Sequence, residues 1–124
     1  MCLVDDLESM VKANDYCNRY GTDTISVGAA CAFAIECFEN GLLTLEQTDG
    51  LELKWGNGPA MAELARRICM RETWLGELLA DGTLKATEQI PGSFEYAMQI
   101  GGQELPMHDQ RLTYGLYTMY LAEP

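Results

Sequence analysis

Residues 25–38 form the most apolar stretch of the chain, and this stretch limits the possible folds more than any other feature. Glu36, near its end, is the single charged residue within it. A helix of this length extends about 20 Å, which is too short for the roughly 30 Å hydrocarbon core of a bilayer. Apolar residues cover nearly its whole circumference, which is typical of a helix buried on every side. We therefore expect a central core helix, part of whose cover comes from outside this 124-residue chain.

The remaining periodicity predicts a mainly α-helical domain of about five helices with a minor two-stranded β element. Apolar spacing predicts a first helix over residues 6–20, which Gly21 ends, and a second over residues 25–39. A third helix begins at Asn57-Gly58-Pro59, and two shorter helices cover about 75–80 and 84–89. Residues 51–55 and 96–100 alternate in polarity as half-buried strands do, so we expect them to pair with each other.

Charge and cysteine content exclude several classes of function. The formal charge of −11 and the eight Lys and Arg residues argue against binding to nucleic acid or to an anionic membrane. The first residues show no basic segment followed by an apolar one, so no secretory signal is predicted and we expect a cytoplasmic protein. Five cysteines without CxxC spacing predict free, buried thiols rather than disulfides or a metal site.

Residues 18–24 join the first two predicted helices through a glycine turn. Such a turn directs the free amides and hydroxyls of a helix N-terminus outward. This arrangement suits an anion or a heterocycle rich in donors and acceptors. Any tight helix–helix junction requires the same residues, so spacing alone leaves both interpretations open.

The residues themselves resemble a known family. The match begins with residues 14–28, NDYCNRYGTDTISVG, which are similar to the pterin-binding stretch of the tungsten aldehyde:ferredoxin oxidoreductases. Four later blocks resemble that family in the same order, namely AFAIEC (32–37), GLLT (41–44), TDGLELKWG (48–56) and ELPMHD (104–109). The resemblance therefore defines a partial family domain over residues 1–111, followed by a divergent tail over residues 112–124.

The resemblance implies a set of cofactor-binding residues. In the family, a D-x-x-G-L-D motif contacts one of two pterins that bind the metal through dithiolenes. The matching positions here are Asn18, Gly21, Thr22 and Asp23. Asn18 replaces a carboxylate and can hydrogen-bond without carrying charge, and Thr22 replaces a leucine. Gly21 permits the turn, and the Asp23 carboxylate can accept hydrogen bonds from pterin N–H groups.

The family's cluster ligands, three cysteines at C-x-x-C-x-x-x-C spacing plus a later one, do not occur here. The resemblance thus implies a fragment of an enzyme that oxidises aldehydes to acids and is inactive alone. The parent would use a tungsten or molybdenum bis-pterin and a 4Fe-4S cluster, and we expect this chain to bind neither by itself. Ferredoxin and the remaining enzyme domains are the implied partners of the parent, in which His108, followed by Asp109, is the candidate catalytic acid–base. The alternative is a stand-alone helical interaction module, and in either case we expect the isolated chain to form a homo-oligomer.

Overall fold

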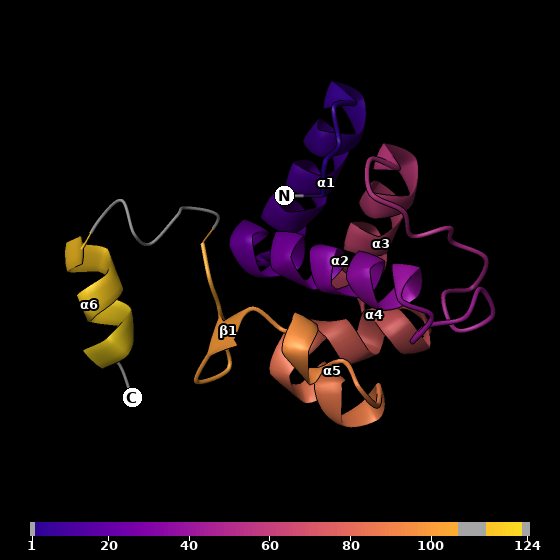
Figure 1. Cartoon of the computed structure of the whole chain (residues 1–124). Helices are drawn as coiled ribbons and strands as arrows, with labels where there is room; N and C mark the ends of the chain where they lie inside the picture. Colours follow the sequence, from indigo (N-terminus) through magenta and orange to yellow (C-terminus); the bar gives the residue numbers. More distant parts are fainter. Residues whose placement is uncertain (1, 107–113, 123–124) are drawn as a thin grey trace.

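The structure, a computed structural model, describes residues 2–106 and 114–122. It confirms a mainly α-helical fold, with a bundle of five helices and one small two-stranded sheet (Figure 1). A further helix lies apart from the bundle near the C-terminus. The elements in chain order are α1 (Leu7–Tyr20), α2 (Thr24–Glu39), α3 (Gly58–Met70), α4 (Thr73–Ala80), α5 (Thr83–Gln89), the 3-10 helix η1 (Phe94–Tyr96), β1 (Gln99–Ile100), β2 (Gln103–Glu104) and α6 (Tyr114–Ala122).

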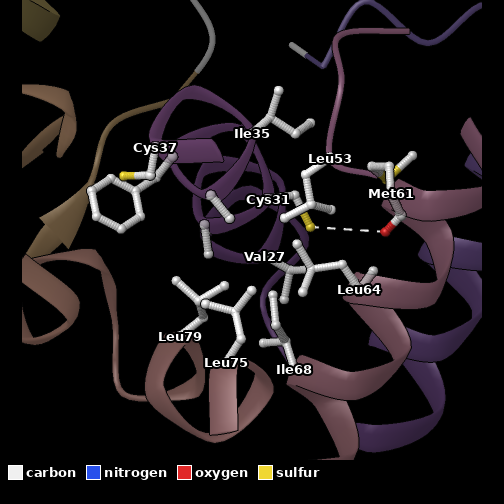
Figure 2. Packing of buried hydrophobic residues seen from close by; sticks show 14 of the residues in the cluster. Val27, Cys31, Ile35, Cys37, Leu53, Met61, Leu64, Ile68, Leu75 and Leu79 are labelled. Atoms are coloured by element: carbon white, nitrogen blue, oxygen red, sulfur yellow. Dashed lines mark hydrogen bonds between the residues drawn. The ribbon is translucent and has the colours of Figure 1, made fainter. Parts of the chain in front are cut away.

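Helix α2 is the centre of the core, as its apolar sequence predicts. Helices α1, α3 and α5, η1 and strand β2 all contact it. The buried side chains of α2 pack against leucines and Ile68 of the neighbouring elements (Figure 2). Its cover comes from within the described chain along most of its length, and Ile25 at its start is its one exposed large apolar residue. The expected exposure of apolar α2 surface is therefore confined to that first turn.

Two close approaches fix how helix α3 packs. A Cβ added at Gly58 would lie 3.0 Å from the Cβ of Ser9, so the starts of α1 and α3 touch directly. A Cβ added at Gly76 of α4 would lie 2.7 Å from the carbonyl oxygen of Arg67, which places α4 against the backbone of α3. Glycine is required at Gly76, because a side chain there would push the α3 backbone away, whereas a side chain at Gly58 would displace the Ser9 side chain by a few tenths of an ångström.

The prediction of a strand over residues 51–55 is wrong. This segment runs in an irregular conformation whose carbonyl and amide groups bond locally: Lys54 N–H donates to the carbonyl of Glu52, and Asn57 Nδ2 donates to the same oxygen. Leu53 is fully buried, which explains the apolar alternation. The alternation of apolar and polar residues over 51–55 therefore arises from the burial of Leu53 and not from a β-strand.

Strand β1 instead pairs with β2, its neighbour in the chain. The two form an antiparallel hairpin in which Gln99 lies opposite Glu104 and Ile100 opposite Gln103. Gly101 and Gly102 form the turn with φ angles of 60° and 90°. Two consecutive residues with positive φ match the twist of a two-residue hairpin, so the turn selects the local partner over a distant one.

Helix α1 exposes several large apolar side chains. Leu7, Met10 and Val11 recur at helical spacing, yet they face outward, and Leu7 and Val11 are 71% and 58% exposed. The α1 face that meets α3 instead carries Ser9, Ala13 and Cys17. The tail also forms α6, whose Tyr114 and Met119 are exposed. Among the described residues, no helix has the length and apolar character needed to cross a membrane.

Candidate functional site

The turn between α1 and α2 has the geometry that its sequence predicts. Gly21 ends α1 in the left-handed conformation, with φ 66° and ψ 32°, and its N–H donates to the carbonyl of Cys17. The N–H of Thr22 donates to the same carbonyl over 2.9 Å. A Cβ added at Gly21 would meet no atom within 4 Å, so the turn opens directly to its surroundings. The φ angle, not crowding, is what requires glycine here.

Asp23 caps the N-terminus of helix α2. Its Oδ2 accepts the N–H of Ser26 over 2.8 Å, and its own carbonyl accepts the N–H of Val27. The side chain is exposed, and the capping bond involves one of its two carboxylate oxygens. A carboxylate at this position stabilises the helix through the capping bond and the helix dipole. Asp23 therefore has a structural role in addition to any role in ligand binding.

Asn18 and Thr22 lie on either side of the glycine. Asn18 is exposed on the last turn of α1, whereas Thr22 is half-buried. Thr22 lines a groove of about 240 Å³. The groove also contains Ser26 and Val27 of α2, Gly82 before α5, and Glu104 of the hairpin. Because Ile68 of α3 and Leu79 of α4 also line it, the groove joins most elements of the bundle to the predicted turn.

Glu104 forms one wall of this groove, although no local sequence pattern predicts that role. Its side chain is 7% exposed, and Oε1 accepts both the N–H of Thr83 over 2.8 Å and the Thr83 hydroxyl over 3.1 Å. The carboxylate therefore caps the start of α5 across 21 residues of sequence. Long-range capping has no local sequence pattern, so the sequence indicates Glu104 only as part of the family-like block at residues 104–109.

The groove combines carboxylates with hydroxyl donors. Asp81 and Glu104 supply carboxylates at its wall, and Thr22 and Ser26 supply hydroxyl groups. Such a surface repels phosphate but can accept hydrogen bonds from the N–H groups of a heterocycle. The polar groups of its lining therefore fit one edge of a pterin ring, whereas the exposed Asn18 and Asp23 are not among the residues that line the groove.

The other predicted site residue, His108, lies outside the described residues, as does Asp109. Within residues 2–106 and 114–122, no three His, Cys, Asp or Glu side chains gather in a way that could bind a metal ion. Cys2, Cys17, Cys31, Cys37 and Cys69 are free thiols, and the first four are buried, as predicted. Burial raises the pKa of Cys37 to about 12.

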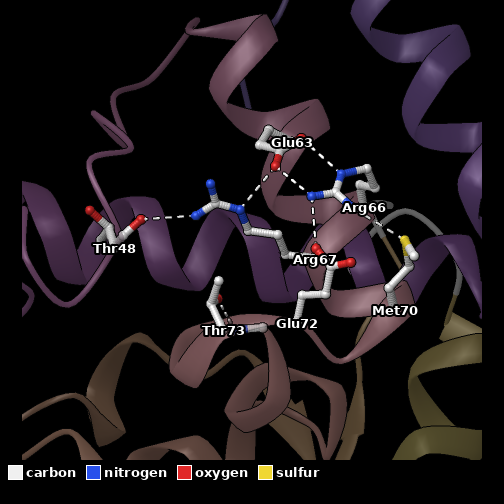
Figure 3. Close-up of polar contacts among 8 residues, drawn as sticks. Thr48, Glu63, Arg66, Arg67, Met70, Glu72 and Thr73 are labelled. Atoms are coloured by element: carbon white, nitrogen blue, oxygen red, sulfur yellow. Dashed lines mark hydrogen bonds and ion pairs between the residues drawn. The ribbon is translucent and has the colours of Figure 1, made fainter.

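A carboxylate with a strongly lowered pKa lies elsewhere, at the junction of α3 and α4. Figure 3 shows Glu63 accepting hydrogen bonds from Arg66 and Arg67, at distances from 2.8 to 3.0 Å. Arg66 also pairs with Glu72 over 2.9 Å. The bond from Arg66 is the main cause that lowers the pKa of Glu63 to about 2. Every charge in this cluster has a partner, which is typical of a structural network rather than a reactive site.

Comparison with known proteins gives consistent matches. The family model described as "Aldehyde ferredoxin oxidoreductase, domains 2 & 3" matches residues 1–124. The tungsten-containing aldehyde ferredoxin oxidoreductase of Pyrococcus abyssi is 36% identical over 111 residues, and that of Thermococcus kodakarensis is 36% identical over 109 residues. Each alignment covers 87% of this chain and 18% of the relative. The WOR-like subunit of an aliphatic sulfonate oxidoreductase from Pyrococcus furiosus is 33% identical over 84% of this chain and 17% of that subunit.

Proposed function

Because this chain belongs to the aldehyde ferredoxin oxidoreductase family, we propose that it supplies one side of a pterin-binding surface. The binding residues are those of the α1–α2 turn, namely Asn18, Gly21, Thr22 and Asp23. The chain spans less than a fifth of the length of its curated relatives. We therefore propose aldehyde oxidation for a complete enzyme that contains this domain, and not for the 124-residue chain alone.

The observation that carries the proposal is the convergence of the turn with the neighbouring groove. Gly21 leaves the turn open, and Asp23 and Asn18 present exposed acceptor groups. Thr22 and Glu104 continue the polar surface into the groove. A pterin edge carries both donors and acceptors, so a row of carboxylate, amide and hydroxyl groups can bind and orient it.

In the complete enzyme, a tungsten or molybdenum pterin would supply the redox chemistry that converts an aldehyde to a carboxylic acid. The residues of this chain would position the cofactor, and His108 would transfer a proton near the substrate. Electrons would leave through an iron–sulfur cluster to ferredoxin, with both the cluster and the remaining pterin contacts provided by other domains. We propose a cytoplasmic location for such an enzyme and no catalytic activity for the 124-residue chain by itself.

A second candidate function is a stand-alone interaction module derived from the same family. The exposed apolar residues along α1 favour it, because a contiguous apolar surface is typical of a docking face. The two functions differ in their need for the turn. An interaction module would still dock through α1 after mutation of the α1–α2 turn. A pterin half-site would lose its function after the same mutation.

The test is an anaerobic titration of the purified chain with metal-bis-pterin cofactor released from an intact family member. We would compare the wild-type chain with Asp23→Ala, which removes both charge and helix cap, and with Asp23→Ser, which keeps a capping hydroxyl. Asp6→Ala is a matched control because Asp6 is the N-cap of α1, where its side chain accepts from the N–H of Glu8.

We expect the chain to retain no cofactor by itself, but saturable binding of added cofactor that both Asp23 variants weaken at least tenfold, and that Asp6→Ala leaves unchanged, would support a half-site at the turn. Equal loss in Asp23→Ala and Asp6→Ala, with Asp23→Ser unaffected, would mean that helix stability alone was being measured. If the cofactor binds saturably and with the same affinity to wild type and to both Asp23 variants, the pterin binds elsewhere and the proposal is refuted.

A further inference from the structure

A second pocket lies against the middle of helix α2 and is separate from the groove beside Thr22. It encloses about 200 Å³. Its walls come from α2, from the segment that precedes α3, from η1 and from the residues that flank the hairpin. Among the described residues, its lining shares none with that groove or with the α1–α2 turn, so what it binds is independent of the proposed pterin surface. The side chains that determine its chemistry are Phe33, Glu36, Trp55, Tyr96, Met98 and Leu105.

Backbone contacts hold the walls of this pocket in place. The N–H of Leu105 donates to the carbonyl of Met98 over 3.3 Å, which extends the hairpin pairing to both residues. Gly56, which follows Trp55, donates its N–H to the carbonyl of Cys2 over 2.9 Å, and this bond ties the segment of Trp55 to the start of the chain. The 3-10 helix η1 contacts α2 directly. The pocket is therefore formed before any ligand binds, as most small-molecule sites are.

Aromatic and apolar side chains dominate the lining. Trp55 is 36% exposed and Tyr96 is half-buried, so both side chains remain accessible, whereas Phe33 is buried. Met98 and Leu105 add a thioether and an aliphatic group. The face of an aromatic ring carries a negative quadrupole potential, and tryptophan attracts cations more strongly than the other aromatic residues. A pocket of this composition favours a ligand that is both apolar and positively charged.

Glu36 supplies the charge of the lining. It is half-buried, and its backbone carbonyl accepts a hydrogen bond from Asn40 Nδ2 over 2.8 Å. Its carboxylate, in contrast, forms no hydrogen bond or ion pair within residues 2–106 and 114–122. A partly buried carboxylate without a partner loses hydration that nothing replaces, and a bound cation would supply that partner. The formal charge of −11 adds to the preference for a positively charged ligand.

We propose that this pocket binds a small quaternary ammonium ion against Trp55, Tyr96 and the Glu36 carboxylate. Glu36 would repel an anion, and a hard metal ion requires several oxygen ligands, whereas the lining offers one carboxylate. A primary ammonium is strongly hydrated and would lose that water on entering an apolar pocket. A quaternary ammonium carries its charge beneath apolar methyl groups and has no N–H that needs an acceptor. Pockets for drug-sized ligands are about 300–1,000 Å³, so a volume of about 200 Å³ suits a smaller ion of this kind.

Tryptophan fluorescence tests the site directly. The chain contains two tryptophans, Trp55 in the pocket and Trp74 on α4, so Trp74→Phe leaves Trp55 as the sole emitter. The probe is choline, added as its chloride in exchange for sodium chloride so that the ionic strength stays constant. Saturable quenching of Trp55 by choline is expected. The neutral isostere, in which carbon replaces the nitrogen, should bind about tenfold more weakly because it lacks the attraction to the rings and to Glu36.

Two glutamates of α2 provide matched variants in the Trp74→Phe background. Glu36→Gln keeps the shape of the side chain and removes its charge, so it should weaken choline binding about fivefold. Glu39→Gln removes the same charge at an exposed position outside the lining and should bind choline as Trp74→Phe does. Circular dichroism checks that each variant keeps the helical fold.

Equal affinity for choline and for its neutral isostere would overturn the proposal, since the pocket would then select apolar surface and not charge. This comparison needs no substitution in the pocket. Equal weakening by Glu36→Gln and Glu39→Gln would also overturn it, because the effect would then come from net charge alone. Unchanged affinity in Glu36→Gln, or no saturable quenching in Trp74→Phe, would have the same meaning.

Discussion

Asp23 and Glu63 are both acidic residues with hydrogen-bonded carboxylates, but their surroundings give them different roles. Asp23 is exposed and bonds one backbone N–H, so it retains capacity to accept from a ligand. Glu63 accepts from two guanidinium groups and links successive turns of α3. The contrast explains why the sequence could indicate Asp23, which lies in a recognisable turn. The i,i+3 and i,i+4 spacing from Glu63 to Arg66 and Arg67 is typical of ion pairs along one helix, whereas the further pair of Arg66 with Glu72 depends on how α4 follows α3.

Glu63 should make stability depend on acid pH. Its folded-state pKa of about 2 lies below the ordinary value of 4.5, so its stabilisation is present above pH 4.5 and is lost as pH falls from 4.5 to 2. The side chain is 34% exposed, so solvent screening reduces the contribution to about 1 kcal/mol. Urea unfolding of Glu63→Gln should show that loss at pH 7 and little difference from wild type near pH 2.

The control for this prediction is Glu88→Gln, which changes an exposed glutamate of α5. It should change the free energy of unfolding by less than about 0.5 kcal/mol at either pH. If Glu63→Gln destabilises the protein equally at both pH values, the loss arises from packing and not from the ionised carboxylate.

At the scale of elements, the long helices were predictable and the irregular segments were not. Residues 25–38 predict α2 because apolar content, small residues and flanking N-cap residues all agree. Residues 51–55 mislead because one buried leucine between polar neighbours has the period of a strand. Helix α6 was missed because YGLYTMYLA is apolar and aromatic all round, which leaves no amphipathic period to detect.

The hairpin and helix α5 should separate when Glu104 is truncated. Glu104→Ala leaves the N–H of Thr83 without its acceptor in a buried position, at a cost of about 1–3 kcal/mol. Hydrogen exchange followed by mass spectrometry should show faster exchange in residues 83–86 and in the hairpin, with α1 unchanged. The exposed neighbour Gln103→Ala serves as control and should exchange like wild type.

Local loosening in Glu104→Ala would also bear on the proposed site, because Glu104 forms a wall of the groove beside Thr22. If exchange rises uniformly over the whole chain, the residue supports global stability and not the junction of hairpin and helix. If hydrogen exchange does not become faster anywhere, the hydrogen bond from the Thr83 N–H to Glu104 makes no net contribution to stability, because water can replace Glu104 as the acceptor.

For the whole molecule, two properties oppose each other: a formal charge of −11 and an exposed apolar stripe. Here the stripe is defined as Leu3, Leu7, Met10 and Val11, all of which are exposed. In an intact enzyme we propose that other domains cover it. In the isolated chain, copies of the stripe can cover each other, and exchange of the C-terminal segment that contains α6 offers a further route.

We therefore predict that the isolated chain self-associates through the stripe and does so more strongly at high salt. Like charges on two copies repel at low ionic strength, and salt screens that repulsion while leaving apolar burial intact. Sedimentation velocity across a concentration series should show a larger weight-average mass in 1 M sodium chloride than in 20 mM. The double variant Leu7→Glu/Val11→Glu should remain monomeric at both salt concentrations.

A charge-matched control distinguishes loss of apolar surface from added repulsion. Gln89→Glu/Gln103→Glu adds the same two negative charges at exposed positions outside the stripe. If it associates like wild type at high salt while Leu7→Glu/Val11→Glu does not, the stripe is the interface. If both variants associate equally, the contact lies elsewhere, and deletion of residues 112–124 then tests exchange of the C-terminal segment. A wild-type monomer at every concentration and salt level would contradict self-association by either route, and the exposed stripe would then require a different partner.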